Sequence, residues 1–367
     1  MPDDHGQSDH SPPNRCPRES IALDQIGTVD ESLDESHDRA FVDMWIQDFV
    51  ACAFSAADEV GIFALLAKGQ RTATDIADAL RLDSDSVLAV CRALAGLGGL
   101  TTHNNTFALT SFTRSCWVKQ TPTYRGREFD RHRDWPQHKR IVETLELGWS
   151  PIDDGDIPFA DGWLDGSVDP ESASCFTRVM HSMAFAPSLS ASRCPAIVGS
   201  RLLDIGGGSG VFSAAWLAHH PKSRATVVDL APVCAASKRI LEKYESGARV
   251  EYCPCNLFRD PWPEGADLMW ISNVLHDWPL EKCHLILKNA YSSLPQGGCL
   301  FIHEQLLNPD RCTPSTTALY NLLMRMNFKG QQFTKQELFE LVAQSGFVDP
   351  TVVYTYANWT VIKAQKT

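Results

Sequence analysis

Short apolar runs alternate with helical segments over residues 199–365, and this alternation constrains the fold more than any other feature of the sequence. It predicts an α/β fold, in which a doubly wound, mainly parallel sheet is covered by helices on both faces. Strands are expected at RLLDIG (201–206), RATVVDL (224–230), RVEYCPC (249–255), DLMWISN (267–273) and GCLFIHEQL (298–306). Helices are expected at 209–220, 232–244, 280–294 and 334–347, and a terminal β-hairpin at 350–357 and 359–365. In such a sheet, ligands bind beyond the carboxyl ends of the strands.

The front part of the chain has a helical period instead. From about residue 38, apolar residues recur at spacings of three and four, and two short extended runs then flank the turn pair Asn104-Asn105. Helices followed by a two-stranded wing are typical of a winged helix, which can bind DNA. The helix that would enter the groove, DSDSVLAVCRAL, carries two acids and one arginine. A dimerisation or scaffolding role is therefore favoured over DNA binding.

These patterns divide the chain into four segments. Residues 1–35 hold nine acids against two arginines, which predicts a disordered acidic tail. Residues 36–120 are expected to form the helical, winged-helix-like dimerisation domain, and residues 121–197 linker helices and a substrate lid. Residues 198–367 are expected to form the ligand-binding and catalytic domain.

Charge and cysteine content restrict the partners and the compartment. The formal net charge of −12 argues against nucleic acid or an anionic membrane as partner. There is no uninterrupted apolar run near the ~20 residues that span a bilayer. The amino-terminal segment lacks the apolar core of a secretory signal, so a cytoplasmic protein with reduced thiols is expected. Cys253 and Cys255 have no second His or Cys pair nearby, so no metal site is predicted.

The first strand runs into a glycine loop, DIGGGSG, which lets the backbone approach a ligand closely. Val211 and Ser213 stand where a dinucleotide-binding G-x-G-x-x-G needs glycine, and no Walker Gly-Lys-Ser/Thr ending follows. Asp204, before the loop, would repel phosphate. Asp229, at the end of the second strand, is placed to accept both hydroxyls of a ribose. The loop and the two acids together fit S-adenosylmethionine, whose sulfonium is positive.

A histidine follows the fourth strand at the same edge of the sheet. His276 in NVLHDW is the candidate catalytic base. Asp277 beside it can orient the ring or bind substrate, and Glu304, which closes the fifth strand, can hold the imidazole tautomer.

Taken together, DIGGGSG, VVDLAP, NVLHDW, the final GF before the hairpin and the helical front domain resemble one family. It is the S-adenosylmethionine-dependent O-methyltransferases of the caffeate and hydroxyindole (acetylserotonin) type, and the resemblance covers about residues 38–367. It implies the class I methyltransferase sheet and an intertwined homodimer. It also implies methyl transfer from S-adenosylmethionine to a hydroxyl of an aromatic or heteroaromatic small molecule, as in secondary metabolism.

The resemblance also assigns residues. Gly206 would lie at the methionine end of the cofactor, Asp229 at the ribose and His276 would be the general base. The other contacts that it implies, around adenine, are Leu230, Asn256, Leu257 and Ser272. Asp204 is expected to contact the cofactor on the argument from the loop given above. The acceptor pocket would be lined by Phe176, Met180, Leu322, Leu323 and Asn327, although plain core packing explains Met180 and the run from Leu322 equally well.

Three positions depart from the family pattern. Asn256 replaces an acid that contacts adenine, and its amide oxygen can still accept a hydrogen bond. Ser272 replaces a lysine common in caffeate-type enzymes. Gln332 replaces one of two acids that flank the catalytic histidine, so it can hydrogen-bond the ring but cannot stabilise its charge.

Gln332 leaves other chemistries open. A nitrogen or an activated carbon could accept the methyl group, because either needs a weaker base than a phenol does. A protein of this fold that binds S-adenosylmethionine without transferring methyl is a second alternative, and a winged-helix transcription factor is a third.

Overall fold

The carboxyl-terminal half is built on one mixed β-sheet. We analysed a computed structural model that describes residues 34–149 and 161–367. Within them, the sheet has the strand order β10-β11-β8-β7-β4-β5-β6, and β9 pairs with β8. Strands β4 to β8 run parallel, whereas β11 is antiparallel to β8 and to β10. The strands are β4 (Arg201–Ile205), β5 (Arg224–Asp229), β6 (Val250–Pro254), β7 (Leu268–Ser272), β8 (Cys299–Leu307), β9 (Phe333–Thr334), β10 (Val348–Tyr356) and β11 (Trp359–Gln365).

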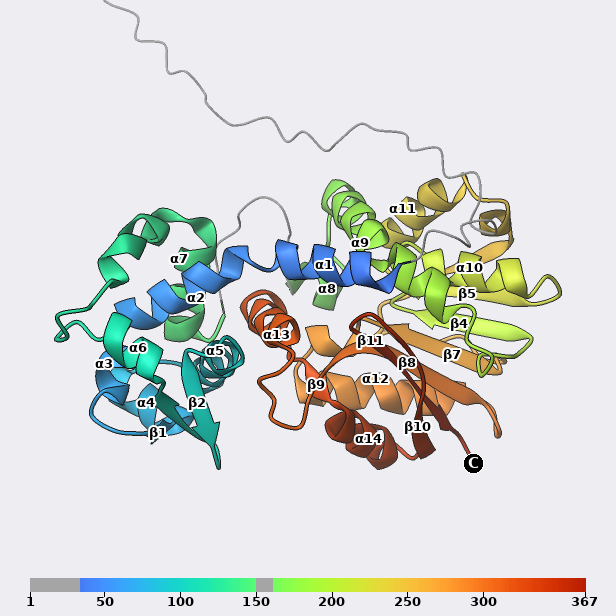
Figure 1. The fold of residues 1–367 in the computed structure, drawn as a ribbon. Coiled ribbons are helices and arrows are strands. Elements are labelled where there is room, and N and C mark those ends of the chain that lie inside the picture. The colour runs from blue at the N-terminus through green and yellow to red at the C-terminus, as the bar shows by residue number, and fades with distance from the viewer. Residues whose placement is uncertain (1–33, 150–160) are drawn as a thin grey trace, which may run out of the picture.

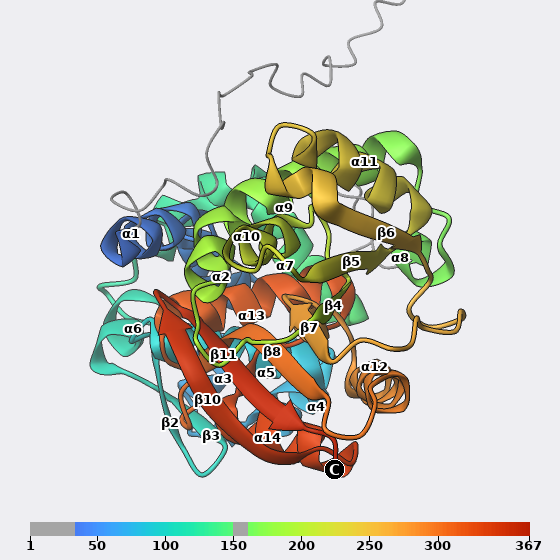
Figure 2. The ribbon, with the colours of Figure 1, turned by 90° about the vertical axis from the view of Figure 1, so that its right-hand side faces the viewer.

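Helices cover both faces of this sheet (Figure 2). They are α9 (Pro170–Ala191), α10 (Val211–His219), α11 (Ala231–Leu241), α12 (Leu280–Ser293) and α14 (Lys335–Gln344), with short turns η2 (Ser246–Arg249) and η3 (Leu275–Asp277). Side chains alternate along β8, so that Phe301 belongs to the same buried cluster as Trp216 of α10, and Ile302 to the same buried cluster as Ile286 of α12. The predicted doubly wound sheet with a terminal hairpin is confirmed.

The amino-terminal part is a helical unit with a small three-stranded sheet, β1-β3-β2. Its elements are α1 (Glu35–Trp45), α2 (Asp48–Glu59), α3 (Ile62–Leu66), β1 (Arg71–Thr72), α4 (Ala73–Leu80), α5 (Ser84–Gly96), β2 (Leu100–His103), β3 (Thr106–Leu109) and α6 (Ser111–Cys116). Thr72 caps α4 through a capping box, and Asp83 caps α5. The wing is where the extended runs predicted it. Strand β1 has two residues, which is too short to leave a pattern in the sequence.

The connecting segment holds η1 (Gly126–Asp134), α7 (Pro136–Leu147) and α8 (Asp161–Asp165) before α9. Most of the predicted acidic tail, residues 1–33, lies outside the described residues, as do residues 150–160 of the predicted lid.

One helix that the sequence analysis did not identify, α13 (Ser315–Phe328), joins the two halves. Leu319, Leu322 and Met326 belong to the same buried cluster as Phe63 of α3 and Val90 of α5. Figure 1 shows α13 between the amino-terminal helices and the sheet. The helix is buried on almost every side, so it lacks the one-sided apolar period that marks a surface helix.

Helix α1 also crosses between the halves (Figure 1). Arg39 donates to the carbonyl of Ala357 at 3.1 Å, and Glu35 accepts from the amide of Ala357 at 3.0 Å, so α1 is tied to the β10–β11 turn. The helical stretch Glu35–Glu59 has the length and mean hydropathy of a membrane span, yet half of its most apolar window is buried inside the protein. Core helices of globular proteins have the same property.

Candidate active site

The carboxyl ends of the parallel strands bring the predicted cofactor residues to one edge of the sheet. Between β4 and α10, the glycine loop turns through positive φ at Gly206 (62°) and Gly208 (54°), which only glycine adopts without strain. A Cβ on Gly206 would lie 2.7 Å from Val274 Cγ2. The loop therefore needs glycine at 206 both for its shape and for the space.

The two acids near the loop have different surroundings. Asp204 is buried beneath the loop and accepts a hydrogen bond from Ser213 Oγ at 2.7 Å. Burial raises the pKa of Asp204 to about 7. This hydrogen bond braces α10 against the loop. Asp229 accepts from the backbone amides of Gly208 at 2.9 Å and Leu230 at 2.7 Å. Burial raises the pKa of Asp229 to about 6.

Asn256, predicted to contact adenine, joins the loop after β6 to α8. Its Nδ2 donates to the carbonyl of Leu164 at 3.1 Å, and its Oδ1 accepts from the amide of Phe258 at 3.0 Å. A Cβ on Gly166 would lie 3.4 Å from Asn256 Nδ2 and 3.7 Å from a methyl of Leu230. The end of α8 thus covers two of the predicted adenine contacts.

The remaining cofactor candidates are Leu257 and Ser272. Leu257 packs against the core beside α12, and a Cβ on Gly206 would lie 3.7 Å from its side chain. Ser272 Oγ lies 2.9 Å from Nδ1 of His303 on the neighbouring strand. Burial lowers the pKa of His303 to about 3, so Ser272 faces a neutral partner.

His276 in η3 is held between two carboxylates. Its Nδ1 lies 2.6 Å from Glu304 Oε2, and its Nε2 lies 3.4 Å from Asp277 Oδ1. Burial on its own would lower the pKa of His276, but the charges of Glu304 and Asp277 outweigh it and raise the pKa to about 9. The two other predicted catalytic residues therefore both contact His276.

Gln332 lies on the segment that passes His276. The amide of Gln331 donates to the carbonyl of His276 at 2.9 Å, and the amide of Gln332 donates to Asn321 Oδ1 of α13 at 2.8 Å. Gln332 is 4% exposed, and neither polar atom of its side chain has a hydrogen-bond partner among the described residues. A buried amide without partners points to a ligand that satisfies it.

The predicted acceptor residues are distributed between α9 and α13. On α9, Phe176 lies 5.0 Å from the ring of Trp163 and packs against the cluster that includes α13, while Met180 is half-buried. On α13, Leu322 is wholly buried and Leu323 nearly so, so both contribute to the core. Asn327 accepts a hydrogen bond from Arg140 of α7.

Two aromatic residues beside the site escaped the sequence analysis. The ring of Tyr320 meets the ring of His276 edge-on, with 5.7 Å between centroids, and Trp163 covers Phe176. Neither residue belongs to a motif. Tyr320 lies in α13, which is buried on almost every side and therefore lacks a one-sided apolar period.

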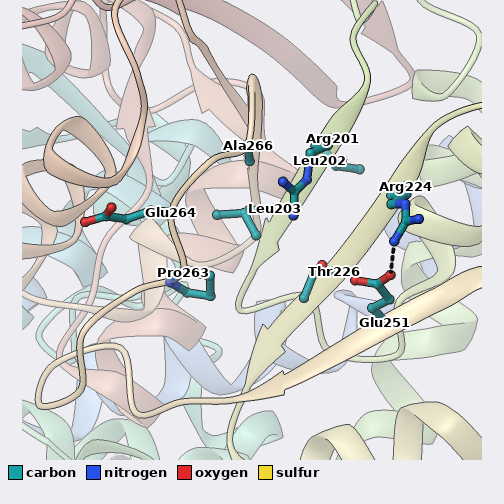
Figure 3. A pocket seen from close by; sticks show the side chains of 9 residues that line it. All are labelled: Arg201, Leu202, Leu203, Arg224, Thr226, Glu251, Pro263, Glu264 and Ala266. Atoms are coloured by element: carbon teal, nitrogen blue, oxygen red, sulfur yellow. Dashed lines mark hydrogen bonds and ion pairs between the residues drawn. The ribbon is translucent and has the colours of Figure 1, made fainter.

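A small hollow lies at the opposite end of the sheet. It measures about 50 Å³ and is lined by the first residues of β4 and β5, Arg201 and Arg224, with Glu251 of β6 (Figure 3). Because ligands of such sheets bind at the carboxyl ends of the strands, we assign no function to it.

Comparison with known proteins agrees with the fold. Residues 168–348 match the O-methyltransferase domain family. The chain is 28% identical to a 3-hydroxy-5-methyl-1-naphthoate 3-O-methyltransferase of Streptomyces sahachiroi over 299 residues, which are 80% of this chain and 84% of that one. It is 34% identical to bovine acetylserotonin O-methyltransferase over 165 residues, which are 45% of this chain and 47% of that one.

Solved structures give the same result. A family 2 O-methyltransferase from Planctomyces limnophilus in complex with apigenin matches with a TM-score of 0.75 at 25% identity, over 90% of this chain and 96% of that one. Human N-acetylserotonin methyltransferase in complex with S-adenosylmethionine has the same fold, with a TM-score of 0.56 at 23% identity over 92% and 99% of the two chains. Residues 168–348 therefore form an S-adenosylmethionine-dependent O-methyltransferase domain.

Proposed function

We propose that this enzyme methylates a hydroxyl of an aromatic or heteroaromatic small molecule, with His276 as the general base. The observation that carries the proposal is the buried contact of His276 with Glu304 and Asp277 beside the glycine loop. The relatives support the acceptor class, since their names specify a naphthoate and acetylserotonin, and one matched structure holds apigenin.

The residues around the loop fit the cofactor. We propose that the loop at Gly206 receives its methionine part, Asp229 the ribose hydroxyls, and Leu230, Asn256 and Leu257 the adenine. We retain Ser272 as an adenine contact, whereas Asp204 is assigned to support of the loop. When bound, S-adenosylmethionine supplies a methyl group made electrophilic by the adjacent sulfonium.

The raised pKa of His276 suits proton removal from a phenol. A phenol has a pKa of ~10, so little of it is ionised at neutral pH. An imidazole with a pKa near 9 is a stronger base toward that hydroxyl than an ordinary histidine. Glu304 contacts Nδ1, so Nε2 is the nitrogen that would take the acceptor proton, and Glu304 would stabilise the imidazolium that forms.

We propose that the acceptor lies between α9 and α13. Phe176 and Met180 of α9 would provide apolar contacts to its ring, with Leu323 and Tyr320 on the α13 side. The unpartnered amide of Gln332 would hydrogen-bond a second polar group of the acceptor. Leu322 and Asn327 would support this wall through the core and through Arg140.

We also propose that the enzyme is a homodimer in the cytoplasm. Phe41 and Met44 lie three residues apart on one face of α1 and are 59% and 64% exposed, which suits contact with a second copy. The described cysteines are all free thiols, which agrees with a reducing compartment.

Binding and turnover test the proposal in sequence. Calorimetric titration should show micromolar binding of S-adenosylmethionine and of S-adenosylhomocysteine. A panel of phenols, hydroxyindoles and aromatic amines, with methylated products identified by mass spectrometry, then tests the acceptor class. Methylation confined to amines or to carbon would contradict the hydroxyl acceptor.

A further inference from the structure

Three side chains form a hydrogen-bonded chain that ends on the glycine loop. His181 of α9 has Nδ1 3.0 Å from Ser209 Oγ and Nε2 3.1 Å from Tyr244 Oη. Ser209 is 4% and Tyr244 is 3% exposed. Ser209 lies within the loop DIGGGSG, so this chain connects α9 to the segment that approaches the cofactor.

The positions of the protons follow from the partners. Among the described residues, Tyr244 Oη has His181 Nε2 as its one hydrogen-bond partner. Burial raises the pKa of Tyr244 to about 12, so the phenol keeps its proton. In the opposite direction Ser209 would donate to Nδ1, and the buried Tyr244 hydroxyl would be left without an acceptor among the described residues, at a cost of about 1–3 kcal/mol. We therefore take Tyr244 to donate to Nε2, because the donor then left over is the Ser209 hydroxyl on the glycine loop, where a ligand can accept its proton.

The tautomer of His181 is fixed by that contact. Burial lowers the pKa of His181 to about 4, with Lys243 acting in the same direction, so the ring is neutral near pH 7. With Nε2 accepting, the single ring proton is on Nδ1 and is donated to Ser209 Oγ. The hydroxyl proton of Ser209 remains available, and no acceptor for it is found in residues 34–149 and 161–367.

The loop is thus held from two sides. Asp229 accepts from the amide of Gly208 at 2.9 Å, and His181 bonds the next residue from α9. S-adenosylmethionine carries one anionic group, the carboxylate of its methionine part, and hydroxyl-to-carboxylate hydrogen bonds are among the stronger ones in proteins.

We propose that Tyr244, His181 and Ser209 form a directed relay that presents the Ser209 hydroxyl proton to the cofactor carboxylate. In it, Ser209 is the contact and His181 is a positioning residue. The inference rests on the cofactor site described above, and it adds a source of affinity specific for the amino-acid part of the cofactor.

The test compares two ligands on the full-length protein. S-adenosylhomocysteine has the carboxylate, whereas 5′-methylthioadenosine keeps the adenosine and the sulfur but lacks the amino-acid group. By calorimetry, Ser209→Ala and His181→Phe should each lower the affinity for S-adenosylhomocysteine about tenfold, which corresponds to the loss of one good hydrogen bond. The affinity for 5′-methylthioadenosine should stay within about twofold.

Further variants test the direction of the relay. His181→Asn retains a donor near the position of Nδ1, so it should restore most of the affinity that His181→Phe loses. Tyr244→Phe removes the donor that fixes the tautomer of His181. Its affinity for S-adenosylhomocysteine should therefore lie between those of the wild type and His181→Phe. The double variant of His181→Phe and Ser209→Ala should bind S-adenosylhomocysteine no more weakly than either single variant does, because both substitutions remove the same contact.

Ser182→Ala is the matched control, since Ser182 is exposed on α9 and its Oγ bonds only the carbonyl of Val179 in its own helix. Both ligands should bind this variant as they bind the wild type. Equal weakening of the two ligands by His181→Phe, or unchanged binding of both, would overturn the relay. Failure of the wild type to bind S-adenosylhomocysteine would instead reject the cofactor site itself.

Discussion

At the scale of the residue, the proposed chemistry depends on His276 and the two carboxylates that touch it. Glu304 lies within β8, three residues before its end, and Asp277 is the next residue after His276 in η3, so one contact is fixed by the sheet and the other by a local turn. The pKa of His276 rises to about 9, which makes the ring a stronger base but a less abundant one at neutral pH.

The pH dependence of turnover follows from that rise. Neutral imidazole accumulates as the pH approaches 9, so kcat should climb from pH 7 to about pH 9 instead of levelling near 6.5. Glu304→Gln removes the nearer carboxylate, lowers the pKa of His276 and should move the rise to lower pH. A profile of kcat between pH 6 and 10 for both proteins measures this, and identical profiles would contradict the role of Glu304. Because the pKa of His276 is higher in the folded protein than in the unfolded chain, protonation of His276 stabilises the fold. This contribution is fully present below pH 6.5 and is lost as the pH rises through about 9.

Removal of the ring tests the base itself. His276→Ala should lower kcat by about 10²–10⁴-fold on an ordinary phenol, with the affinity for S-adenosylhomocysteine unchanged. A nitrophenol acceptor is already ionised in solution and needs no base, so kcat with this acceptor should fall much less. Steady-state kinetics with the two acceptors distinguish proton removal from simple damage to the pocket, which would slow both equally.

We expect Gln332 to affect both the use of the acceptor and the free energy of unfolding. Its amide is buried without a partner, which costs about 1–3 kcal/mol in the free protein. Gln332→Leu should therefore raise the free energy of unfolding while lowering kcat/KM for the acceptor. Gln336→Leu, the same change at an exposed position of α14, should alter neither by much. Denaturant unfolding and steady-state kinetics measure both quantities, and a Gln332→Leu enzyme with full acceptor specificity would argue against a contact with substrate.

At the scale of the element, what could be predicted from the sequence was local. The five parallel strands and the wing each leave a short-range pattern, and each is present in the structure. The glycine loop and the histidine after the fourth strand also stand out, because strand ends carry the chemistry in this type of sheet. These patterns identify the edge of the sheet at which the candidate site lies.

What the sequence did not reveal depends on contacts between distant segments. Asn256 bonds the carbonyl of Leu164, and that pairing has no sequence signature. Asp204 accepts a hydrogen bond from Ser213 of α10 at Oδ2, a contact that its position before the loop does not indicate. Helix α13 was missed because burial on nearly all sides removes the apolar period that identifies a helix.

Helix α13 also makes the two halves depend on each other. Leu322 is wholly buried in the cluster that includes the amino-terminal helices, although it belongs to the carboxyl-terminal part of the chain. Leu322→Ala should cost about 2–5 kcal/mol of the free energy of unfolding. Leu280→Ala, at a position 48% exposed, should cost little. Denaturant titration by circular dichroism measures both, and a loss below 1 kcal/mol at Leu322 would mean that α13 is not part of the amino-terminal core.

At the scale of the whole molecule, α1 has two different faces. Val42 and Ile46 are buried, whereas Phe41 and Met44 on another face are largely exposed. The same helix is hydrogen-bonded to the β10–β11 turn, so it spans both halves of one chain (Figure 1). Phe41 and Met44 form a short exposed apolar patch on it. Exposed apolar side chains grouped in this way favour association with another surface.

We expect that second surface to belong to another copy of the chain. Phe41→Asp combined with Met44→Asp introduces two charges that an apolar interface cannot bury without a large cost, so the dimer should dissociate. Sedimentation velocity measures the change in mass, and Lys68→Asp, on an exposed polar position of the same domain, is a control for added charge. A wild type that sediments as a monomer would reject the dimer. A dimer that survives the double substitution would move the interface away from α1. Because α1 also reaches the β10–β11 turn beside β8 and Glu304, comparing kcat for the separated chains would then show whether the dimer supports the site.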